Sequence, residues 1–425
     1  MPHALKASPG GRASSAQERP PAAPAPASRP LRVLIVDTAI AFGGTLAVAR
    51  NLLKHLDSKV IEASLVSACA DGFVSDGFAG EAQIRLLAPR VDYVTLQKWK
   101  ESIHRRWRWR PMRRGLELVV MGTEFLANLP YVIRLAHLCR RMRIDVLHSN
   151  NFAAEPLWAA RLLGIAIVSH LHGMLYPPME GTRRRNFRHV KAFVSISRAV
   201  TESAVRTGVD PQRIHEIPNF VERVPDASPP PMPQAPAIGI FGRVTHWKGQ
   251  KEFLRAAIRV LERFPHLRVY IVGDASDGDP RYFEECREIA RASAFADRFE
   301  FTGRVSDVAS YYRKCTVVVH ASIDPEPFGM VLIEGMAEAR PLVASLLGAP
   351  TEIIEDGVEG YLVNPKDTET LANRIIALLA DPALATNMGR KGHRKVLEHY
   401  DPRVAARRFE RLYRQVARSE TQHRP

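Results

Sequence analysis

Short apolar runs rich in Val and Ile recur along the chain, and each is followed by a stretch with helical spacing. In the first half these runs are LRVLIVD, DVLHSNN, AIVSHLHG and AFVSIS, at 31–37, 145–151, 166–173 and 192–197. Their length and β-branched residues predict buried strands, and their alternation with helices predicts a parallel sheet covered on both faces. We therefore expect an α/β protein.

A second series of such runs begins after a proline-rich segment. Positions 222–236, ERVPDASPPPMPQAP, contain six prolines. Proline cannot continue a helix or a central strand, so this segment is predicted to be an interdomain linker. Beyond it, AIGIFGRV, LRVYIVGD, FEFTGRV and TVVVHAS predict strands at 237–244, 267–274, 299–305 and 316–322.

The predicted organisation is therefore two doubly wound, Rossmann-like domains. An Ala- and Pro-rich disordered leader (1–30) is followed by an N-terminal domain (31–221), the linker (222–236) and a C-terminal domain (237–425), whose final helix can return to the first domain. Ligands of such sheets bind beyond the carboxyl ends of the strands. We expect substrates in the cleft between the two domains, with the acceptor on the N-terminal side.

Charge is distributed unevenly along the 425 residues, whose formal net charge is +15. Positions 1–236 contain 32 basic and 19 acidic residues, whereas the remainder contains 28 and 26. The basic half indicates an anionic partner such as a membrane surface, a nucleic acid or a phosphorylated substrate. No apolar run reaches the roughly 20 residues of a bilayer span, and the leader lacks the apolar core of a signal peptide. We expect a cytoplasmic protein.

The segment EPFGMVLIEGMAEA (326–339) directly follows the predicted strand TVVVHAS. Pro327 and Gly329 mark a turn, and the residues from Met330 onward favour a helix. A helix N-terminus here would direct free N–H groups and its positive dipole end at the cleft, which suits a diphosphate. Glu334 falls in the second turn, where its carboxylate can accept both hydroxyls of a ribose, and Glu326 can reach a sugar. The alternative is an acidic first turn that stabilises its own helix.

These residues carry a resemblance to a known family. EPFGMVLIE, with two Glu residues flanking seven others, resembles the signature of the GT-B glycosyltransferases of family 4 (group 1). FGRVTHWKGQ with Arg243 and Lys248, IVGD with Gly273, IHEIPNFV with Asn219, and the block at 345–367 are similar to other segments of that family. In the first half Gly43-Gly44, His172-Gly173 and VSISRAV also match, whereas 71–143 matches no segment that we can place.

The resemblance implies a GT-B fold and a retaining, metal-independent transfer of a sugar from a nucleotide diphosphate donor, without a cofactor. It implies catalytic roles for four residues: Arg243, Lys248, Glu326 and His172. It implies donor binding by a further set: Gly43, Gly44, Asn219, Gly273, Phe328, Gly329, Met330, Val331 and Glu334.

Residue chemistry supports two of these roles independently. Negative charge develops on the leaving phosphate as the glycosidic bond breaks, and a guanidinium with an ammonium can stabilise it. Arg243 and Lys248 are the candidate pair, although such residues near a helix start are often solvated surface charges. Gly43 and Gly44 follow the first strand, where a missing Cβ lets backbone approach a ligand, or where an ordinary turn forms. His172 ends a strand and is either a ligand of the donor or a structural hydrogen-bonding residue.

Metal and redox chemistry receive little support. Asp277-Gly278-Asp279 forms a DxD triplet, which in another glycosyltransferase fold would hold a divalent cation. The basic pair and the helix terminus already match the phosphate charge, so we expect no metal. Cys69, Cys139, Cys286 and Cys315 are far apart without a CxxC pair. They are expected to be buried, reduced thiols.

A basic and aromatic stretch precedes a long apolar-periodic segment. HRRWRWRPMRR (104–114) contains six arginines and two tryptophans, and RRRNFRHVK (183–191) adds further charge. Arg with Trp beside an amphipathic segment is typical of an interfacial membrane contact, so an anionic membrane surface is the expected partner. A solvated loop and a nucleic-acid patch are the alternatives, and no nucleic-acid-binding module accompanies the charge.

The sequence therefore predicts a membrane-surface glycosyltransferase that moves a sugar from a nucleotide donor to a saccharide or polyprenyl-linked acceptor in polysaccharide or glycolipid synthesis. No carboxylate in the N-terminal half has motif support as a nucleophile, so same-face attack assisted by the departing phosphate is expected. Two alternatives remain open: a nucleotide-sugar epimerase of the same architecture, and a catalytically silent nucleotide-sugar-binding or membrane-surface scaffold protein.

Overall fold

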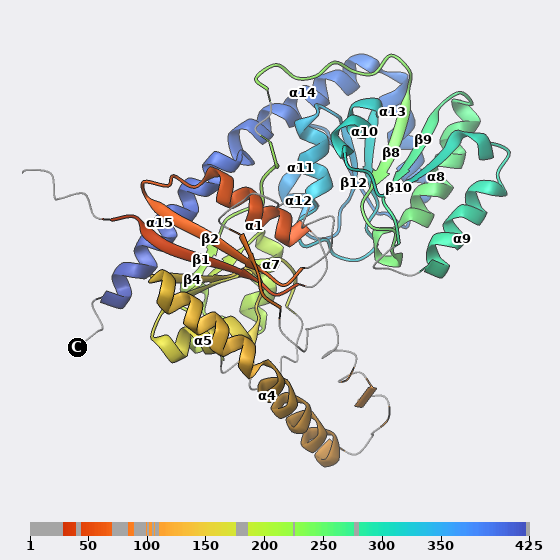
Figure 1. Ribbon diagram of the computed structural model, residues 1–425. Coiled ribbons are helices and arrows are strands. Elements are labelled where there is room, and N and C mark those ends of the chain that lie inside the picture. The colour runs from red at the N-terminus through yellow and green to blue at the C-terminus, as the bar shows by residue number, and fades with distance from the viewer. Residues whose placement is uncertain are drawn as a thin grey trace, which may run out of the picture.

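The computed structural model describes most of the chain, namely 29–39, 44–69, 84–88, 99, 102–103, 106, 110–175, 186–223, 226–275 and 280–421. Two parallel sheets form the centres of two domains (Figure 1). The prediction of an α/β protein with two doubly wound, Rossmann-like domains is confirmed. The leader lies almost wholly outside the described residues.

The N-terminal sheet has seven strands in the order β3-β2-β1-β4-β5-β6-β7. Its strands are β1 (Leu31–Asp37), β2 (Ile61–Ser67), β3 (Ile84–Leu86), β4 (Val146–Ser149), β5 (Ala166–Leu171), β6 (Ala192–Ser195) and β7 (Ile214–Glu216). Its helices are α1 (Gly44–His55), α4 (Arg110–Met142), α5 (Ala154–Leu163) and α7 (Arg198–Arg206), with short 3-10 turns η1 (Phe187–His189) and η2 (Pro211–Arg213). β4 and β5 are buried along their length and β1 from Val33 onward, which explains their continuous apolar runs.

The C-terminal sheet has six strands in the order β10-β9-β8-β11-β12-β13. Its strands are β8 (Ala237–Phe241), β9 (Arg268–Val272), β10 (Phe299–Gly303), β11 (Val317–His320), β12 (Leu342–Ser345) and β13 (Gly360–Val363). Its helices are α8 (Gln250–Arg263), α9 (Pro280–Arg291), α10 (Val308–Lys314), α11 (Met330–Ala337), α12 (Pro350–Ile353), α13 (Thr368–Ala380) and α14 (Pro382–His399), with η3 (His246–Lys248) and η4 (Ala296–Arg298).

The last helix, α15 (Pro402–Thr421), packs against the N-terminal domain although it follows the C-terminal one (Figure 1). Its apolar face contributes Phe409, Leu412 and Tyr413 to the core that also contains residues of β1 and α1. The Tyr413 hydroxyl lies 2.5 Å from Nδ1 of His148 on β4. The chain therefore crosses between the domains twice.

Polar contacts also join the carboxyl ends of the two sheets. The Ser197 hydroxyl, just after β6, donates to the carbonyl of Pro327, which lies beyond β11, at 2.6 Å. The Glu352 carboxylate on α12 accepts from the first backbone N–H groups of α7, those of Arg198 at 2.7 Å and Ala199 at 2.8 Å. A carboxylate at a helix N-terminus is favourable because it meets free N–H donors and the positive dipole end.

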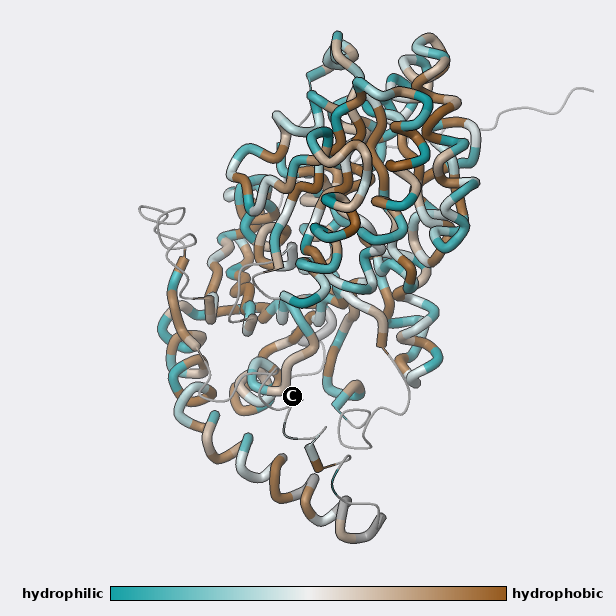
Figure 2. The backbone as a smooth tube through the Cα atoms, turned by 90° about the vertical axis from the view of Figure 1, so that its right-hand side faces the viewer, coloured by the Kyte–Doolittle hydropathy of each residue, from teal (hydrophilic) through white to brown (hydrophobic). Residues whose placement is uncertain are grey.

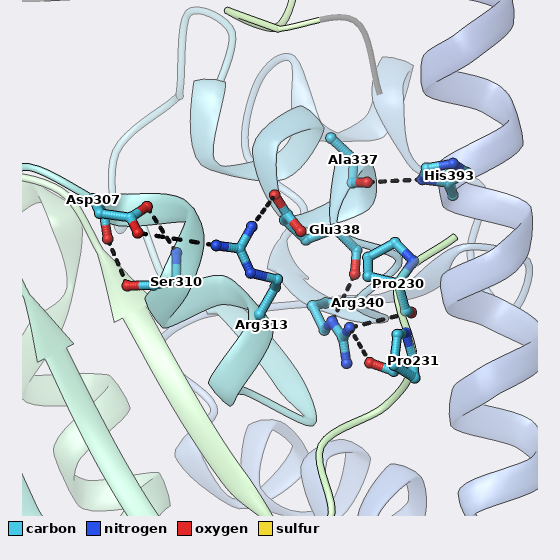
Figure 3. Close-up of polar contacts among 9 residues, drawn as sticks. All are labelled: Pro230, Pro231, Asp307, Ser310, Arg313, Ala337, Glu338, Arg340 and His393. Atoms are coloured by element: carbon cyan, nitrogen blue, oxygen red, sulfur yellow. Dashed lines mark hydrogen bonds and ion pairs between the residues drawn. The ribbon is translucent and has the colours of Figure 1, made fainter. Parts of the chain in front are cut away.

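A buried arginine holds the segment that leads into the second domain (Figure 3). Arg340, which is fully buried before β12, donates from Nη2 to the carbonyls of Pro231 at 2.5 Å and Pro230 at 3.3 Å, and from Nε to the Glu338 carbonyl at 2.7 Å. Burial lowers the pKa of Arg340 from its usual value. Prolines lack an N–H but keep a carbonyl acceptor, so this guanidinium pins the proline-rich segment to the C-terminal domain.

The helix α4 extends away from the body of the N-terminal domain (Figure 1). Its C-terminal half packs against α5, whereas Val119 and Leu126 are 64% and 68% exposed. Hydrophobic residues recur along it, as they do in the strands inside both domains (Figure 2). Among the helices that the structure describes, none is both long and apolar enough for a bilayer crossing.

Candidate active site

The turn that follows β11 holds the Glu326 carboxylate in a fixed position. Its Oε2 atom lies 2.6 Å from the Lys248 ammonium, 3.0 Å from Nε2 of His320 and 2.9 Å from the Ser322 hydroxyl. His320 ends β11 and Ser322 follows it, so both belong to the segment that leads into the turn. Because all three contacts are made to Oε2, none of them occupies the second carboxylate oxygen.

Glu326 is 5% exposed, so its charge depends on these partners. Burial alone would raise the pKa of this carboxyl, but the charge of Lys248 and the contact with His320 outweigh it and lower the pKa well below its usual value. The residue is therefore a carboxylate at neutral pH.

Two glycines, Gly249 and Gly348, allow neighbouring loops to lie in close contact with the segment from Ala321 to Glu326. Gly249 has φ +70°, and a Cβ there would lie 1.9 Å from the Ala321 carbonyl oxygen, so only glycine lets the Lys248 loop rest against the end of β11. Gly348 has φ +85°, and a Cβ there would lie 2.5 Å from the Glu326 carbonyl oxygen. The backbone of Glu326 is held by the same loop, through its bonds with Leu347 and Ala349.

The helix α11 begins directly after this turn, as the sequence predicts. Gly329 occupies its N-cap position with positive φ, and no side chain caps the helix there. The backbone N–H groups of Met330 and Val331 lie in its first turn, which makes them candidate donors to a phosphate. Phe328 is buried and its ring lies 6.1 Å from that of Tyr400, so it anchors the turn rather than facing solvent.

Glu334 lies one turn further along α11 and is half-buried. Its Oε2 accepts from the Tyr312 hydroxyl at 2.8 Å, and the Tyr312 ring stacks on Phe241 at 3.9 Å. Burial raises the pKa of Glu334, and the hydrogen bond from Tyr312 lowers it in part. This contact uses one oxygen and fixes the direction in which the carboxylate presents the other.

Arg243 and Gly273 lie in loops that follow neighbouring strands. The backbone of Arg243 is held after β8 by Gln250, whose side-chain amide donates to its carbonyl at 2.8 Å. The Arg243 side chain is exposed, and the structure gives it no partner among the described residues. Gly273 follows β9 and donates its N–H to the carbonyl of Gly303 at 3.1 Å. Arg243 is therefore an exposed cation, unlike Lys248, whose ammonium is bound to Glu326.

On the N-terminal side a chain of polar groups links three strand ends. Asp37 ends β1 and is fully buried; it accepts from the Asn150 amide at 2.5 Å. Asn150 also donates to the Thr45 carbonyl at 3.0 Å, and its Oδ1 lies 3.1 Å from Nε2 of His172. Thr45 adjoins Gly44, where a Cβ would meet no atom within 4 Å. Asn150 therefore links the His172 ring to the backbone that directly follows Gly44.

The protonation of this chain follows from burial. Burial lowers the pKa of His172 to about 3, so its ring is neutral at physiological pH. Burial raises the pKa of Asp37, and the hydrogen bonds from Asn150 and the Ala39 N–H oppose this increase. A neutral imidazole whose Nε2 faces an amide oxygen donates through that atom. This series of hydrogen-bonded polar groups orients the His172 ring.

Asn219 is 6% exposed, and its Oδ1 atom is buried without a hydrogen-bond partner in the described part of the chain. It lies between β7 and the linker, and two residues further on the Val221 N–H donates at 3.1 Å to the carbonyl of Tyr400, which lies between α14 and α15. Asn219 thus lies close to the place where the chain passes between the domains.

Sequence reasoning missed several polar residues that the structure places around the predicted ones. They are Asp37, Asn150, Ser197, Tyr312, His320, Ser322 and Glu352. Position at a strand's carboxyl end is the signal that could have found Asp37, Asn150 and His320. Gly43, Asp277 and Asp279 lie outside the described residues. Within the described ranges no three His, Cys, Asp or Glu side chains form a group that could hold a metal ion. All four cysteines are buried and free.

The fold and its two facing sheets define a GT-B protein. The crystal structure of Anabaena Alr3699/HepE in complex with UDP and glucose superposes with a TM-score of 0.73 at 20% identity, covering 91% of this chain and 100% of that one. The Rickettsia africae ESF-5 glycosyltransferase superposes with a TM-score of 0.70 at 18% identity, covering 92% and 99%. At these identities the likeness concerns the fold.

Sequence comparisons narrow the class. The family model "Glycosyltransferase Family 4" matches residues 42–223, and "Glycosyl transferases group 1" matches 235–381. The phosphatidyl-myo-inositol mannosyltransferase of Mycobacterium leprae is 28% identical over 79% of this chain and 89% of that protein. The lipopolysaccharide core biosynthesis mannosyltransferase LpcC of Rhizobium leguminosarum bv. viciae is 33% identical over 40% of this chain and 48% of that protein. The chain belongs to the group 1, family 4 glycosyltransferases.

Proposed function

We propose that this glycosyltransferase transfers a sugar from a nucleoside diphosphate donor to a saccharide or lipid-linked acceptor, with retention of configuration and without a metal. The observation that carries the proposal is the buried Glu326 carboxylate, held by Lys248 immediately before the uncapped N-terminus of α11. This arrangement supplies a sugar-binding carboxylate, a cation and free N–H groups within one turn.

The donor is proposed to lie along the carboxyl edge of the C-terminal sheet. Its diphosphate would meet the N–H groups of Met330 and Val331 together with Lys248 and the exposed Arg243. Its ribose would meet Glu334. UDP complexes of the HepE fold relative support a nucleoside diphosphate of this kind.

The acceptor is proposed to enter from the N-terminal domain, and His172, whose ring is held by Asn150, is proposed to contact the donor sugar there. Same-face attack assisted by the departing phosphate needs no protein nucleophile. Asp37 does not supply one, because its carboxylate is fully buried and bound to Asn150 and the Ala39 N–H. The names of the relatives, a lipopolysaccharide core and a phosphatidyl-myo-inositol mannosyltransferase, support a saccharide or lipid-linked acceptor.

Membrane-surface binding by the N-terminal domain belongs to the same proposal. The exposed apolar side chains of α4 follow the Arg- and Trp-rich stretch in sequence, part of which falls outside the described residues. Replacing Arg105, Arg106, Arg108 and Arg110 by Gln should weaken co-sedimentation with phosphatidylglycerol vesicles, by about 1 kcal/mol for each side chain that reaches the surface. Unchanged vesicle binding would favour a soluble acceptor.

The chemical proposal is tested with a panel of nucleotide sugars. Release of nucleoside diphosphate in the presence of lipid-linked or free saccharide acceptors identifies the donor, and the anomeric configuration of the product is read by NMR. Activity should persist in EDTA. Inversion of configuration, or loss of activity that manganese restores, would contradict the proposed mechanism; conversion of the donor sugar without transfer would identify an epimerase.

A further inference from the structure

A cavity of about 270 Å³ lies in the N-terminal domain at the edge of the sheet opposite the candidate active site. Its lining comes from the end of α5, from the residues that precede β5 and β6, and from η1 and η2. His172 follows the carboxyl end of β5, whereas Ile165 and Lys191 precede the amino ends of β5 and β6. A ligand in this cavity is therefore separate from the sugar donor.

The side chains around this cavity are basic. They are Arg161, Arg188, His189, Lys191 and Arg213, and the rest of the lining is formed by Ala, Gly, Ile and Val. No acidic residue lines it among the described residues. A concave surface with charges of one sign concentrates the electrostatic potential and attracts an ion of the opposite sign.

Two contacts of the arginines in this cluster are made to groups that carry no negative charge. Arg213 donates from Nη1 to the Val190 carbonyl at 2.8 Å, which fixes its guanidinium at the cavity wall. The Arg188 Nε atom lies 3.1 Å from Nε2 of His189, so a basic group is paired with another basic group. Burial and the charges of Arg161 and Arg188 lower the pKa of His189.

Among the described residues, the carboxylate of Asp210 approaches one arginine of the cluster. Asp210 approaches the Arg213 Nε atom at 3.8 Å, which is too far for a hydrogen bond, and this Nε is buried without a hydrogen-bond partner in the described part of the chain. Asp210 instead accepts from the Gln212 N–H at 3.0 Å. It therefore offsets part of the Arg213 charge.

We propose that this cluster binds a phosphate group, as a phosphate mono- or diester. Arginine matches the geometry of phosphate oxygens and forms paired hydrogen bonds with them. Sites for drug-sized ligands span about 300–1,000 Å³, so a cavity of this size suits a small anionic group and not a whole nucleotide sugar. The inference does not depend on the proposed reaction. The phosphate comes either from a soluble ester or from a lipid headgroup, and the experiment distinguishes them.

The test compares the wild type with Arg161→Gln/Arg188→Gln, since both side chains are exposed and their loss leaves the core intact. Arg140→Gln/Arg206→Gln removes the same charge from exposed positions of the same domain and is the matched control. Inorganic phosphate is titrated calorimetrically at constant ionic strength. Loss of two charged hydrogen bonds should weaken phosphate binding about tenfold or more in the first variant and leave the control near wild type.

A second arm measures co-sedimentation with vesicles that contain phosphatidylglycerol. Loss of both phosphate and vesicle binding in the cavity variant identifies a lipid headgroup, and loss of phosphate binding alone identifies a soluble ester. Equal phosphate affinity in the wild type and the cavity variant, or equal weakening in the control, would overturn the proposal. Release of nucleoside diphosphate should be the same in the wild type and in both variants. If the wild type releases none, the proposed reaction fails, whereas the phosphate titration still tests the cavity.

Discussion

Replacement of Glu326 by Gln tests the central ion pair of the site. The variant keeps the size of the side chain but removes the charge that Lys248, His320 and Ser322 contact at 2.6, 3.0 and 2.9 Å. The Lys248 ammonium, whose side chain is 17% exposed, would lose its counter-charge. Removing one partner of a buried ion pair lowers the free energy of unfolding by about 3–5 kcal/mol. We expect a loss near the lower bound, because Lys248 is partly exposed and the glutamine amide oxygen can still accept a hydrogen bond from it.

The loss should depend on pH with a defined sign. Because the pKa of Glu326 is lower in the folded protein than in the unfolded chain, its contribution is complete above the unfolded pKa of about 4.5 and declines as the pH falls below it. Denaturant unfolding of wild type and Glu326→Gln should therefore differ by a constant amount near neutral pH, and the difference should shrink below about pH 4.5. A difference independent of pH down to 3 would refute the ion-pair reasoning.

A double-mutant cycle with Lys248→Met separates two roles of the lysine. If Lys248 serves only to hold Glu326, the double variant should lose no more activity than the worse single variant. If it also contacts the leaving phosphate, as we propose, Lys248→Met should lower kcat more than donor affinity, and the double variant should be slower than Glu326→Gln. Unchanged nucleoside diphosphate affinity and kcat in Lys248→Met would remove the lysine from the donor site.

Further substitutions test the contacts around the turn. Glu334→Ala should weaken the donor and the free nucleoside diphosphate alike, by about 1.5–3 kcal/mol for a charged hydrogen bond to their shared ribose, and titration of the diphosphate checks this. Tyr312→Phe should reduce the preference for a ribose over a 2′-deoxyribose diphosphate, measured by competition, with folding preserved. Glu352→Gln should lower the thermal midpoint by removing a helix N-terminal charge worth about 1 kcal/mol, an effect that salt should reduce in the wild type. Arg340→Met should destabilise the fold by about 3 kcal/mol or more, since three carbonyl acceptors lose their donor, and an unchanged unfolding midpoint would contradict this.

The parts of the fold that could be predicted from sequence are the buried strands that lie within longer apolar runs. LRVLIVD and TVVVHAS correspond to β1 and β11 because a strand covered on both faces needs an unbroken apolar run. β3 and β7 contain only three residues each, which is too short for a recognisable period. β12 (LVAS) and β13 (GYLV) include Ala or Gly, which are depleted in strands. β2 was also missed, since its exposed Glu62 interrupts the run in IEASLVS.

For the candidate site, the sequence could predict which residues lie at the carboxyl edge of the sheet, but not which of their side chains contact one another. Glu326 and Lys248 were assigned separately, one to a sugar and one to the leaving phosphate, whereas the structure joins them in one ion pair. That pairing depends on the close approach of two loops 78 residues apart, which Gly249 allows through its contact with Ala321. Tyr312 likewise reaches Glu334 through tertiary packing on Phe241 and not through any local spacing.

The contact between the domains bears directly on the same turn. The Ser197 hydroxyl from the N-terminal domain donates to the carbonyl of Pro327, the residue that follows Glu326. Leu347 and Ala349 hold the Glu326 backbone from within the C-terminal domain, in the loop that leads to α12 and its Glu352. Separation of the domains would therefore break the bonds of Glu352 to α7 and release Pro327 together. The position of the N-terminal domain and the geometry of the Glu326 turn are consequently coupled through these hydrogen bonds. Ser197→Ala, which removes the hydrogen bond to Pro327, should therefore change both the domain contact and the turn.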